Sequence, residues 1–143
     1  MKIYLASPFF NIDEILTYEG VIESLRGRGY EVYVPREHTI PGAWDMPNET
    51  WAGYVFDDDV KAIQECEVVM VLNHGMYSDS GTAWEAGFAR ALEKIVVQVL
   101  CGDANTVYSM MMISGADIVV ELRNAAHWNE VGARVPLSKV IQK

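Results

Sequence analysis

The segment "EVVMVLN", residues 67–73, constrains the fold of this chain more than any other stretch. It is apolar at consecutive positions, so both faces of the strand it predicts must be covered, as in the middle of a parallel sheet. Parallel strands need a long crossover connection, usually a helix. The sequence supplies that alternation. Further strands are predicted at 2–7, 30–35, 94–100 and 116–122, and helices at 12–28, 50–66, 80–93 and 105–113.

This order predicts one domain over residues 1–143: a Rossmann-like or flavodoxin-like α/β sandwich whose five-stranded, mostly parallel sheet carries helices on both faces. The tail at 123–143 shows no strong pattern and is expected to be a helix or irregular cover. Ligands of such folds bind beyond the carboxyl ends of the strands. The loops at 7–11, 36–49 and 74–80 should therefore form the site.

The charge of the chain limits its partners. A net charge of −9, from 20 acidic and 11 basic residues, disfavours binding to a nucleic-acid polymer but is compatible with a small nucleoside. Cys66 and Cys101 lie beside apolar runs and are expected to be reduced, as in a cytoplasmic protein. No signal peptide or membrane-spanning stretch is predicted. Scattered histidines and the lack of phosphate-binding glycine motifs lead us to expect neither a metal nor a cofactor.

The segment "DSGTAWE" contains a carboxylate that needs an explanation. Asp79 or Ser80 is predicted to be the N-cap of the helix. Glu85 then falls early in the second turn. A partly buried glutamate near the positive helix end would be ionised and able to act as a nucleophile. Spacing alone slightly favours a solvated glutamate instead, although its helix face is small and apolar, with Gly81, Ala89 and Leu92.

Two other groups of residues allow two interpretations each. Three adjacent aspartates, 57–59, cannot share one helix face, so at least one should reach solvent. Another could point to the rim near Asp79, where clustered carboxylates raise one another's pKa and make a general acid. Phe9 and Phe10 follow the first strand. They could be core residues or a stacking surface for a flat base, and the sequence does not decide between these.

Three segments in this order, "KIYLASPFF", "VFDDDVKAI" and "YSDSGTAWEAGFARA", resemble the nucleoside 2-deoxyribosyltransferase family from Met1 to about Val120. The resemblance implies the same Rossmann-like fold. It also implies transfer of 2-deoxyribose between nucleobases through a covalent deoxyribosyl-glutamate, with a deoxynucleoside and a free nucleobase as substrates. A homo-oligomer is implied as well, because family members bind the sugar partly through a neighbouring subunit. We expect an assembly built from dimers, either a single dimer or a tetramer or hexamer made of dimers.

The resemblance also assigns roles to single positions. Glu85 matches the nucleophile, and Tyr4 matches the tyrosine that orients it. Asp59 and Asp79 match the aspartates that hold the base and govern its protonation. The further residues expected at the substrate are Phe9, Phe10, Ser7, His38, Gly81, Ser109 and Met111.

Departures from the family pattern keep other functions open. Transferases commonly carry asparagine where Ser109 stands, whereas related nucleotide N-glycoside hydrolases use serine there for a 5′-phosphate. Those hydrolases, however, tend to lack the aspartate at position 79. Thr39, beside His38, replaces a base-reading glutamine of some relatives, so purine or pyrimidine preference is open. A hydrolase of nucleoside 5′-monophosphates and a non-catalytic nucleoside-binding module are the alternatives.

Overall fold

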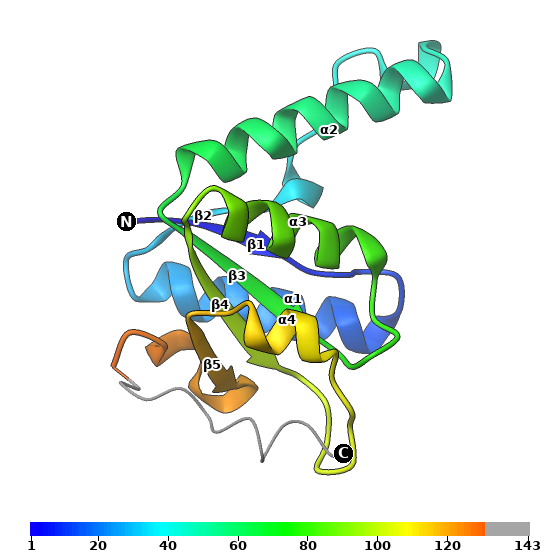
Figure 1. Ribbon diagram of the computed structural model, residues 1–143. Helices are drawn as coiled ribbons and strands as arrows, with labels where there is room; N and C mark the ends of the chain where they lie inside the picture. The colour runs from blue at the N-terminus through cyan, green and yellow to red at the C-terminus, as the bar shows by residue number, and fades with distance from the viewer. Residues whose placement is uncertain (131–143) are drawn as a thin grey trace.

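The computed structural model describes residues 1–130 and has one parallel sheet with strand order β2-β1-β3-β4-β5 (Figure 1). Every neighbouring pair of strands is parallel. The predicted fold class is therefore confirmed, and the sheet is entirely rather than mostly parallel. The strands are β1 (Lys2–Ala6), β2 (Glu31–Tyr33), β3 (Val68–Asn73), β4 (Ile95–Leu100) and β5 (Ile118–Glu121).

Helices cover both faces of this sheet. The α-helices are α1 (Ile12–Gly27), α2 (Asn48–Glu65), α3 (Ser80–Ala91) and α4 (Met110–Ser114). The short 3₁₀ turns are η1 (Pro35–Glu37), η2 (Ala43–Asp45) and η3 (Leu122–His127). Both α1 and η3 pack on one face, whereas α2, α3 and α4 pack on the other.

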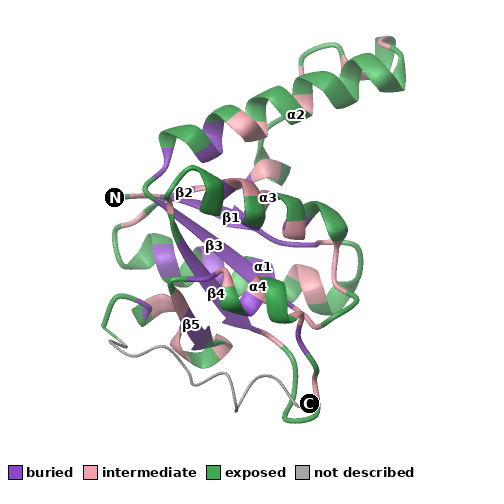
Figure 2. Cartoon of the chain, in the orientation of Figure 1, coloured by how far each residue is buried: buried purple, intermediate pink, exposed green. Residues whose placement is uncertain are grey.

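The two faces alternate along each strand, which decides where polar residues can point. In β1, Ile3 and Leu5 belong to the core beneath α1, whereas Tyr4 belongs to the core beneath α2 and α3. The strands are buried almost throughout, and the outward surfaces of the helices are exposed (Figure 2). A tyrosine in the middle of β1 can therefore act only on the side where α3 carries Glu85.

The structure corrects the predicted start of α2. The helix begins at Asn48, two residues before the predicted start at 50, and Pro47 occupies the cap position. The carboxyl-terminal part of α2 is anchored through the buried Ala62 and Ile63, and Phe56 in the middle of the helix contacts Trp84 of α3. The amino-terminal part projects from the body of the domain (Figure 1). It leaves large aromatic side chains exposed, namely Trp51, Tyr54 and Phe56.

The helix predicted at 105–113 is mostly wrong, because only α4 forms. The Asp103 carboxylate accepts hydrogen bonds from the Asn105 amide at 2.8 Å and the Thr106 hydroxyl at 3.2 Å, which stabilises a turn. The Tyr108 hydroxyl accepts a bond of 2.9 Å from the Gly102 amide. These bonds compete successfully with helix formation.

The tail prediction at 123–143 is met in part by η3, and residues 131–143 lie outside the described part of the chain.

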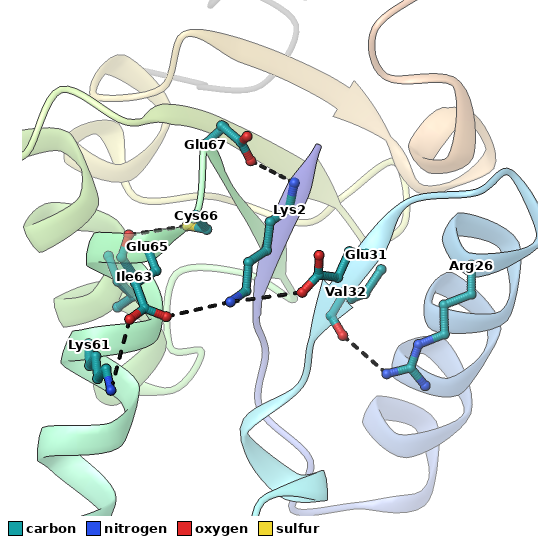
Figure 3. Close-up of polar contacts among 9 residues, drawn as sticks. All are labelled: Lys2, Arg26, Glu31, Val32, Lys61, Ile63, Glu65, Cys66 and Glu67. Atoms are coloured by element: carbon teal, nitrogen blue, oxygen red, sulfur yellow. Dashed lines mark hydrogen bonds and ion pairs between the residues drawn. The ribbon is translucent and has the colours of Figure 1, made fainter.

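The amino ends of the strands are tied together by ion pairs (Figure 3). The Lys2 amide donates to the Glu67 carboxylate at 2.6 Å, and its ammonium lies 3.9 Å from Glu31 and 3.6 Å from Glu65. Lys61 reaches Glu65 at 3.9 Å one helical turn away. Glu31 and Glu65 each have a basic partner and Glu67 accepts a backbone hydrogen bond, so these contacts link β1 to its neighbours. Within residues 1–130, no helix is long and apolar enough to cross a membrane.

Candidate active site

The loop after β3 places Asp79 at the start of α3. Its Oδ2 accepts hydrogen bonds from the Thr82 amide at 2.8 Å and the Thr82 hydroxyl at 2.9 Å, so Asp79 is the N-cap and Ser80 is the first helical residue. Gly81 makes room for this carboxylate, because a Cβ there would lie 3.1 Å from Oδ2. The capping interpretation of Asp79 is confirmed, and its Oδ1 has no partner within residues 1–130.

Glu85 lies one turn further along α3 and is half-buried, which contradicts the solvated interpretation that spacing alone slightly favoured. Its neighbours Thr82, Ala86 and Ala89 form the buried face of the helix. Burial, followed by the negative charges of Asp59 and Asp79, raises the pKa of Glu85 from 4.5 to about 8. The expected stabilisation of the ionised form by the helix end is therefore outweighed, because burial and two nearby carboxylates act in the opposite direction.

Tyr4 approaches Glu85 from the sheet. It is fully buried, and its hydroxyl makes no hydrogen bond of standard geometry within residues 1–130. It nevertheless lies close enough to Glu85 to favour the ionised carboxylate, which lowers the pKa of Glu85 against the larger effect of burial. Burial, then Glu85 and Asp59, raises the pKa of Tyr4, so its hydroxyl keeps its proton. Tyr4 is therefore a donor directed towards Glu85 through a contact looser than an ordinary hydrogen bond.

The three aspartates of α2 separate as predicted. Asp57 and Asp58 are exposed, whereas Asp59 is half-buried. Asp59 shares its helix face with Ala62 and Ile63, which are three and four residues further along and pack on the sheet. Burial and then Asp58 raise the pKa of Asp59 from 3.8 to about 6, against the effects of His38 and Tyr33. Burial is the larger cause, so the carboxylate cluster accounts for only part of the raised pKa of Asp59, through Asp58.

Tyr33 is a residue of this site that sequence reasoning missed. It pairs with Tyr4 across β1 and β2, and the two rings stack with centroids 5.5 Å apart and planes 13° apart. His38 stacks on Tyr33 with centroids 4.1 Å apart and an interplanar angle of 11°. The signal in the sequence was weak. Only the strand register, with Tyr33 at the carboxyl end of β2, places this side chain beside Tyr4.

Phe9 and Phe10 lie at the same rim but stack on each other, with centroids 5.4 Å apart. Phe9 is half-buried beside Tyr18 of α1, and the Arg36 guanidinium lies 5.7 Å from the Phe9 ring centroid. Phe10 is 73% exposed. Phe9 therefore contacts Tyr18 on the α1 side of the sheet.

The remaining predicted substrate residues are dispersed around the rim. The buried Ser7 hydroxyl donates to the Pro8 carbonyl at 2.8 Å. Ser109 precedes α4 without capping it, and Met111 is 78% exposed on the same short helix. These positions follow the carboxyl ends of β1 and β4, and α4 packs beside α3.

Within residues 1–130, no group of three or more His, Cys, Asp or Glu side chains is placed to hold a metal ion.

Comparison with known proteins adds independent information. The profile of a family described as nucleoside 2-deoxyribosyltransferase matches residues 3–122. A 2-deoxyribosyltransferase structure from the psychrotolerant bacterium Bacillus psychrosaccharolyticus is 29% identical, with a TM-score of 0.76 over 99% of this chain and 98% of that one. Curated protein sequences give no match.

Two more distant structures are similar in fold. The Clostridium botulinum CMP N-glycosidase BcmB is 19% identical, with a TM-score of 0.61 over 93% of this chain and 100% of that one. A 2-desoxiribosyltransferase from Leishmania mexicana is 22% identical, with a TM-score of 0.55 over 82% of this chain and 73% of that one. At these identities the likeness concerns architecture alone.

Proposed function

The chain belongs to the nucleoside 2-deoxyribosyltransferase family, and we propose that it transfers 2-deoxyribose from one nucleobase to another through a covalent bond to Glu85. It is thus an enzyme of the pentosyltransferase class. Its substrates in this proposal are a deoxynucleoside and a free nucleobase, without a cofactor. The observation that carries the proposal is the pairing of Glu85 on α3 with Asp59 on α2, two half-buried carboxylates of which Asp59 raises the pKa of Glu85, with the Tyr4 hydroxyl acting on Glu85 from the sheet.

The reaction needs charge of opposite sign at two places. When the bond between C1′ and the base nitrogen breaks, positive charge develops at C1′ and negative charge on the base. Two carboxyl groups answer both demands, as in retaining glycosidases. The Glu85 carboxylate attacks C1′ and forms an ester while the base leaves with the bonding electron pair. Asp59 donates a proton to that base. A second base then attacks C1′, the bond between C1′ and the Glu85 oxygen breaks, and Asp59 takes a proton from the incoming base.

The site holds one proton for this purpose near neutral pH. With pKa values of about 8 for Glu85 and about 6 for Asp59, the pair binds a single proton between these two pH values. By these values the proton lies mainly on Glu85, and the reactive arrangement, with the proton on Asp59 and a negative charge on Glu85, is the less populated of the two. Tyr4 favours this arrangement, because its hydroxyl stabilises the Glu85 carboxylate. Asp79 uses Oδ2 for its cap, so Oδ1 is the oxygen that can contact the base.

Replacement of Glu85 tests the proposal directly. Glu85→Ala should abolish exchange between a deoxynucleoside and a free base, whereas Glu23→Gln on the exposed surface of α1 should leave it intact. Near-normal exchange by Glu85→Ala would reject the assignment. Mass spectrometry of the wild-type protein after brief incubation with substrate should find deoxyribose on the peptide containing Glu85. Absence of exchange and of adduct, with nucleoside binding retained, would favour the non-catalytic binding module.

Hydrolysis of a nucleoside 5′-monophosphate remains the second candidate, because one observation favours it. The Ser109 hydroxyl makes no capping bond to α4 and can contact a 5′-substituent. Incubation with a deoxynucleoside monophosphate and no acceptor base distinguishes the two. Rapid release of sugar phosphate would establish hydrolysis, whereas release that depends on added base would favour transfer.

We also propose a homo-oligomer, dimer-based, in which a second copy covers the projecting part of α2. Trp44 is fully exposed, and Trp51, Tyr54 and Phe56 are about half exposed. Such a group of large apolar side chains is typical of a protein interface. Sedimentation equilibrium of the wild-type protein and of Trp51→Ser would test this.

The free thiols of Cys66 and Cys101 support the proposal of a cytoplasmic location.

A further inference from the structure

Gln98 is a polar residue in the middle of β4, and its side chain is fully buried. It lies on the face of the sheet that α3 covers, since its neighbours on the adjoining strands are Val71 and Val119 of that core. A buried amide costs free energy unless it is hydrogen-bonded, so a glutamine at this position needs a reason.

Asn73, at the carboxyl end of β3, is the partner of this glutamine. It is 1% exposed, and its Nδ2 donates a hydrogen bond of 3.1 Å to Oε1 of Gln98. Its Oδ1 accepts a second hydrogen bond, also of 3.1 Å, from the Gly75 amide. Because Oδ1 must face this backbone donor, Nδ2 is left to face Gln98, which fixes the orientation of both amide groups. The two side chains thus connect the interior of β4 to the loop that follows β3.

Gly75 is the point at which this loop changes direction. Its φ of +133° lies in the region that favours glycine, and a Cβ there would lie 3.2 Å from Cγ2 of Thr106. The next amide, that of Met76, donates to the Val107 carbonyl at 2.7 Å. The Ser78 amide donates to the Gly75 carbonyl at 3.1 Å. Three backbone amides therefore hold the loop, and the first of them depends on a side chain.

The loop leads directly to Asp79, the N-cap of α3. Because Oδ2 of Asp79 is used in the cap, the place of its Oδ1 depends on where the loop delivers the residue. In the proposed function, Oδ1 is the oxygen that contacts the base. Glu85 is held separately, through the buried face of α3, and Asp59 belongs to α2. A displaced loop would therefore move the base contact more than the two other carboxylates.

We propose that Asn73 is a positioning residue, which fixes the loop between β3 and α3 so that Oδ1 of Asp79 meets the base. This inference rests on the proposed function and adds a residue to its machinery. Gln98 holds the Asn73 amide, the Asn73 amide holds Gly75, and the loop carries Asp79. Because the contact to the base is present both before and during bond cleavage, its loss should raise KM for the free base and leave kcat nearly unchanged.

Asn73→Ala tests the proposal, with Val99→Ala as the control for lost stability. Val99 stands next to Gln98 and is fully buried, but it belongs to the core on the α1 side of the sheet. In base exchange, Asn73→Ala should raise KM for the free base about tenfold, as expected for one lost hydrogen bond, with kcat within about twofold of wild type. Val99→Ala should lower the free energy of unfolding without this change in KM.

Amide hydrogen exchange without substrate measures the hold on the loop itself. In Asn73→Ala the Gly75 amide should exchange about tenfold faster than the change in global stability, measured by urea unfolding, accounts for. Val99→Ala should show no such excess. If Asn73→Ala does not fold, Gln98→Leu takes its place, because leucine keeps about the same volume and removes the acceptor that holds Asn73. That variant should give the same two changes in smaller size.

Unchanged KM in a folded variant of an active enzyme would overturn the proposal, and so would an equal rise in KM for Val99→Ala. A Gly75 amide that remains as well protected as in the wild type would overturn it as well. Wild-type protein without exchange activity would reject the proposed function, whereas an active wild type with an unaffected Asn73→Ala variant would reject only the role of Asn73.

Discussion

Glu85→Gln should stabilise the folded protein at neutral and alkaline pH while it removes the proposed nucleophile. The folded-state pKa of Glu85 is about 8, above the ordinary value of 4.5, so folding favours the protonated carboxyl. The free energy of unfolding must therefore fall as pH rises from 4.5 towards 8, and glutamine, which resembles the protonated acid, is free of this loss.

The magnitude follows from the pH interval over which the ionised form is disfavoured. Between pH 4.5 and pH 7 the cost approaches about 1.36 kcal/mol for each pH unit, which sums to an upper limit of about 3 kcal/mol. Glu85 is only half-buried, and solvent screening reduces this limit, so we expect a gain of about 1–2 kcal/mol at pH 7. For a domain of this size, that corresponds to roughly 3–8 °C in Tm.

Urea unfolding followed by tryptophan fluorescence measures the gain. Wild type, Glu85→Gln and the exposed control Glu23→Gln would be compared at about pH 4, 7 and 9. The gain of Glu85→Gln should be near zero at the lowest pH and largest at the highest. A gain that does not depend on pH, or a variant less stable than wild type at about pH 9, would refute the conclusion that folding disfavours the ionised form of Glu85.

Three further predictions concern the same end of the sheet. Base exchange should follow a bell-shaped pH profile with limbs near pH 6 and pH 8, because below the range both Glu85 and Asp59 are protonated and above it neither is; a profile flat across this range would contradict the shared proton. Asp59→Asn should lower kcat by about 10²–10⁴-fold, whereas Asp57→Asn, at an exposed position two residues before it, should leave kcat unchanged; equal losses in a kinetic assay would refute the assignment of Asp59. Gly87→Ala, where a Cβ meets nothing within 4 Å, should stabilise α3 by about 0.5–1 kcal/mol in urea unfolding, whereas Gly81→Ala should not, because its Cβ would crowd the capping carboxylate at 3.1 Å; equal gains would show that the cap has room to move.

The order of strands and helices could be predicted from the sequence because it depends on local patterns. The apolar run in β3 requires cover on both faces of the strand. Along α1 and α3, apolar residues recur regularly at helical spacing. The predicted helix at 105–113 was wrong in most of its length, because the side chain of Asp103 satisfies backbone and hydroxyl donors that a helix would have used. Patterns of hydrophobicity do not record this competition.

The presence of acidic residues at this end of the sheet was predictable from the sequence, whereas their electrostatics was less so. The motif around Glu85 identified the carboxylate, yet its charge state depends on Asp59, which lies on another helix. Tyr33 escaped notice because its relation to Tyr4 is set by strand register, and nothing within "YEVYVP" indicates which residue of another strand lies beside it. Whatever depends on contacts between distant segments had to come from the structure.

The two ends of the sheet differ in how charge is balanced, and this difference bears on which substrates can enter. At the amino end, Lys2 forms ion pairs with Glu31 and Glu65. At the carboxyl end, Asp59, Asp79 and Glu85 gather without an ion pair to any residue between 1 and 130. A doubly charged phosphate approaching these acids meets repulsion from them, whereas an uncharged nucleoside meets none. We therefore expect the field at the entrance to discriminate against phosphorylated sugars before Ser109 is ever reached.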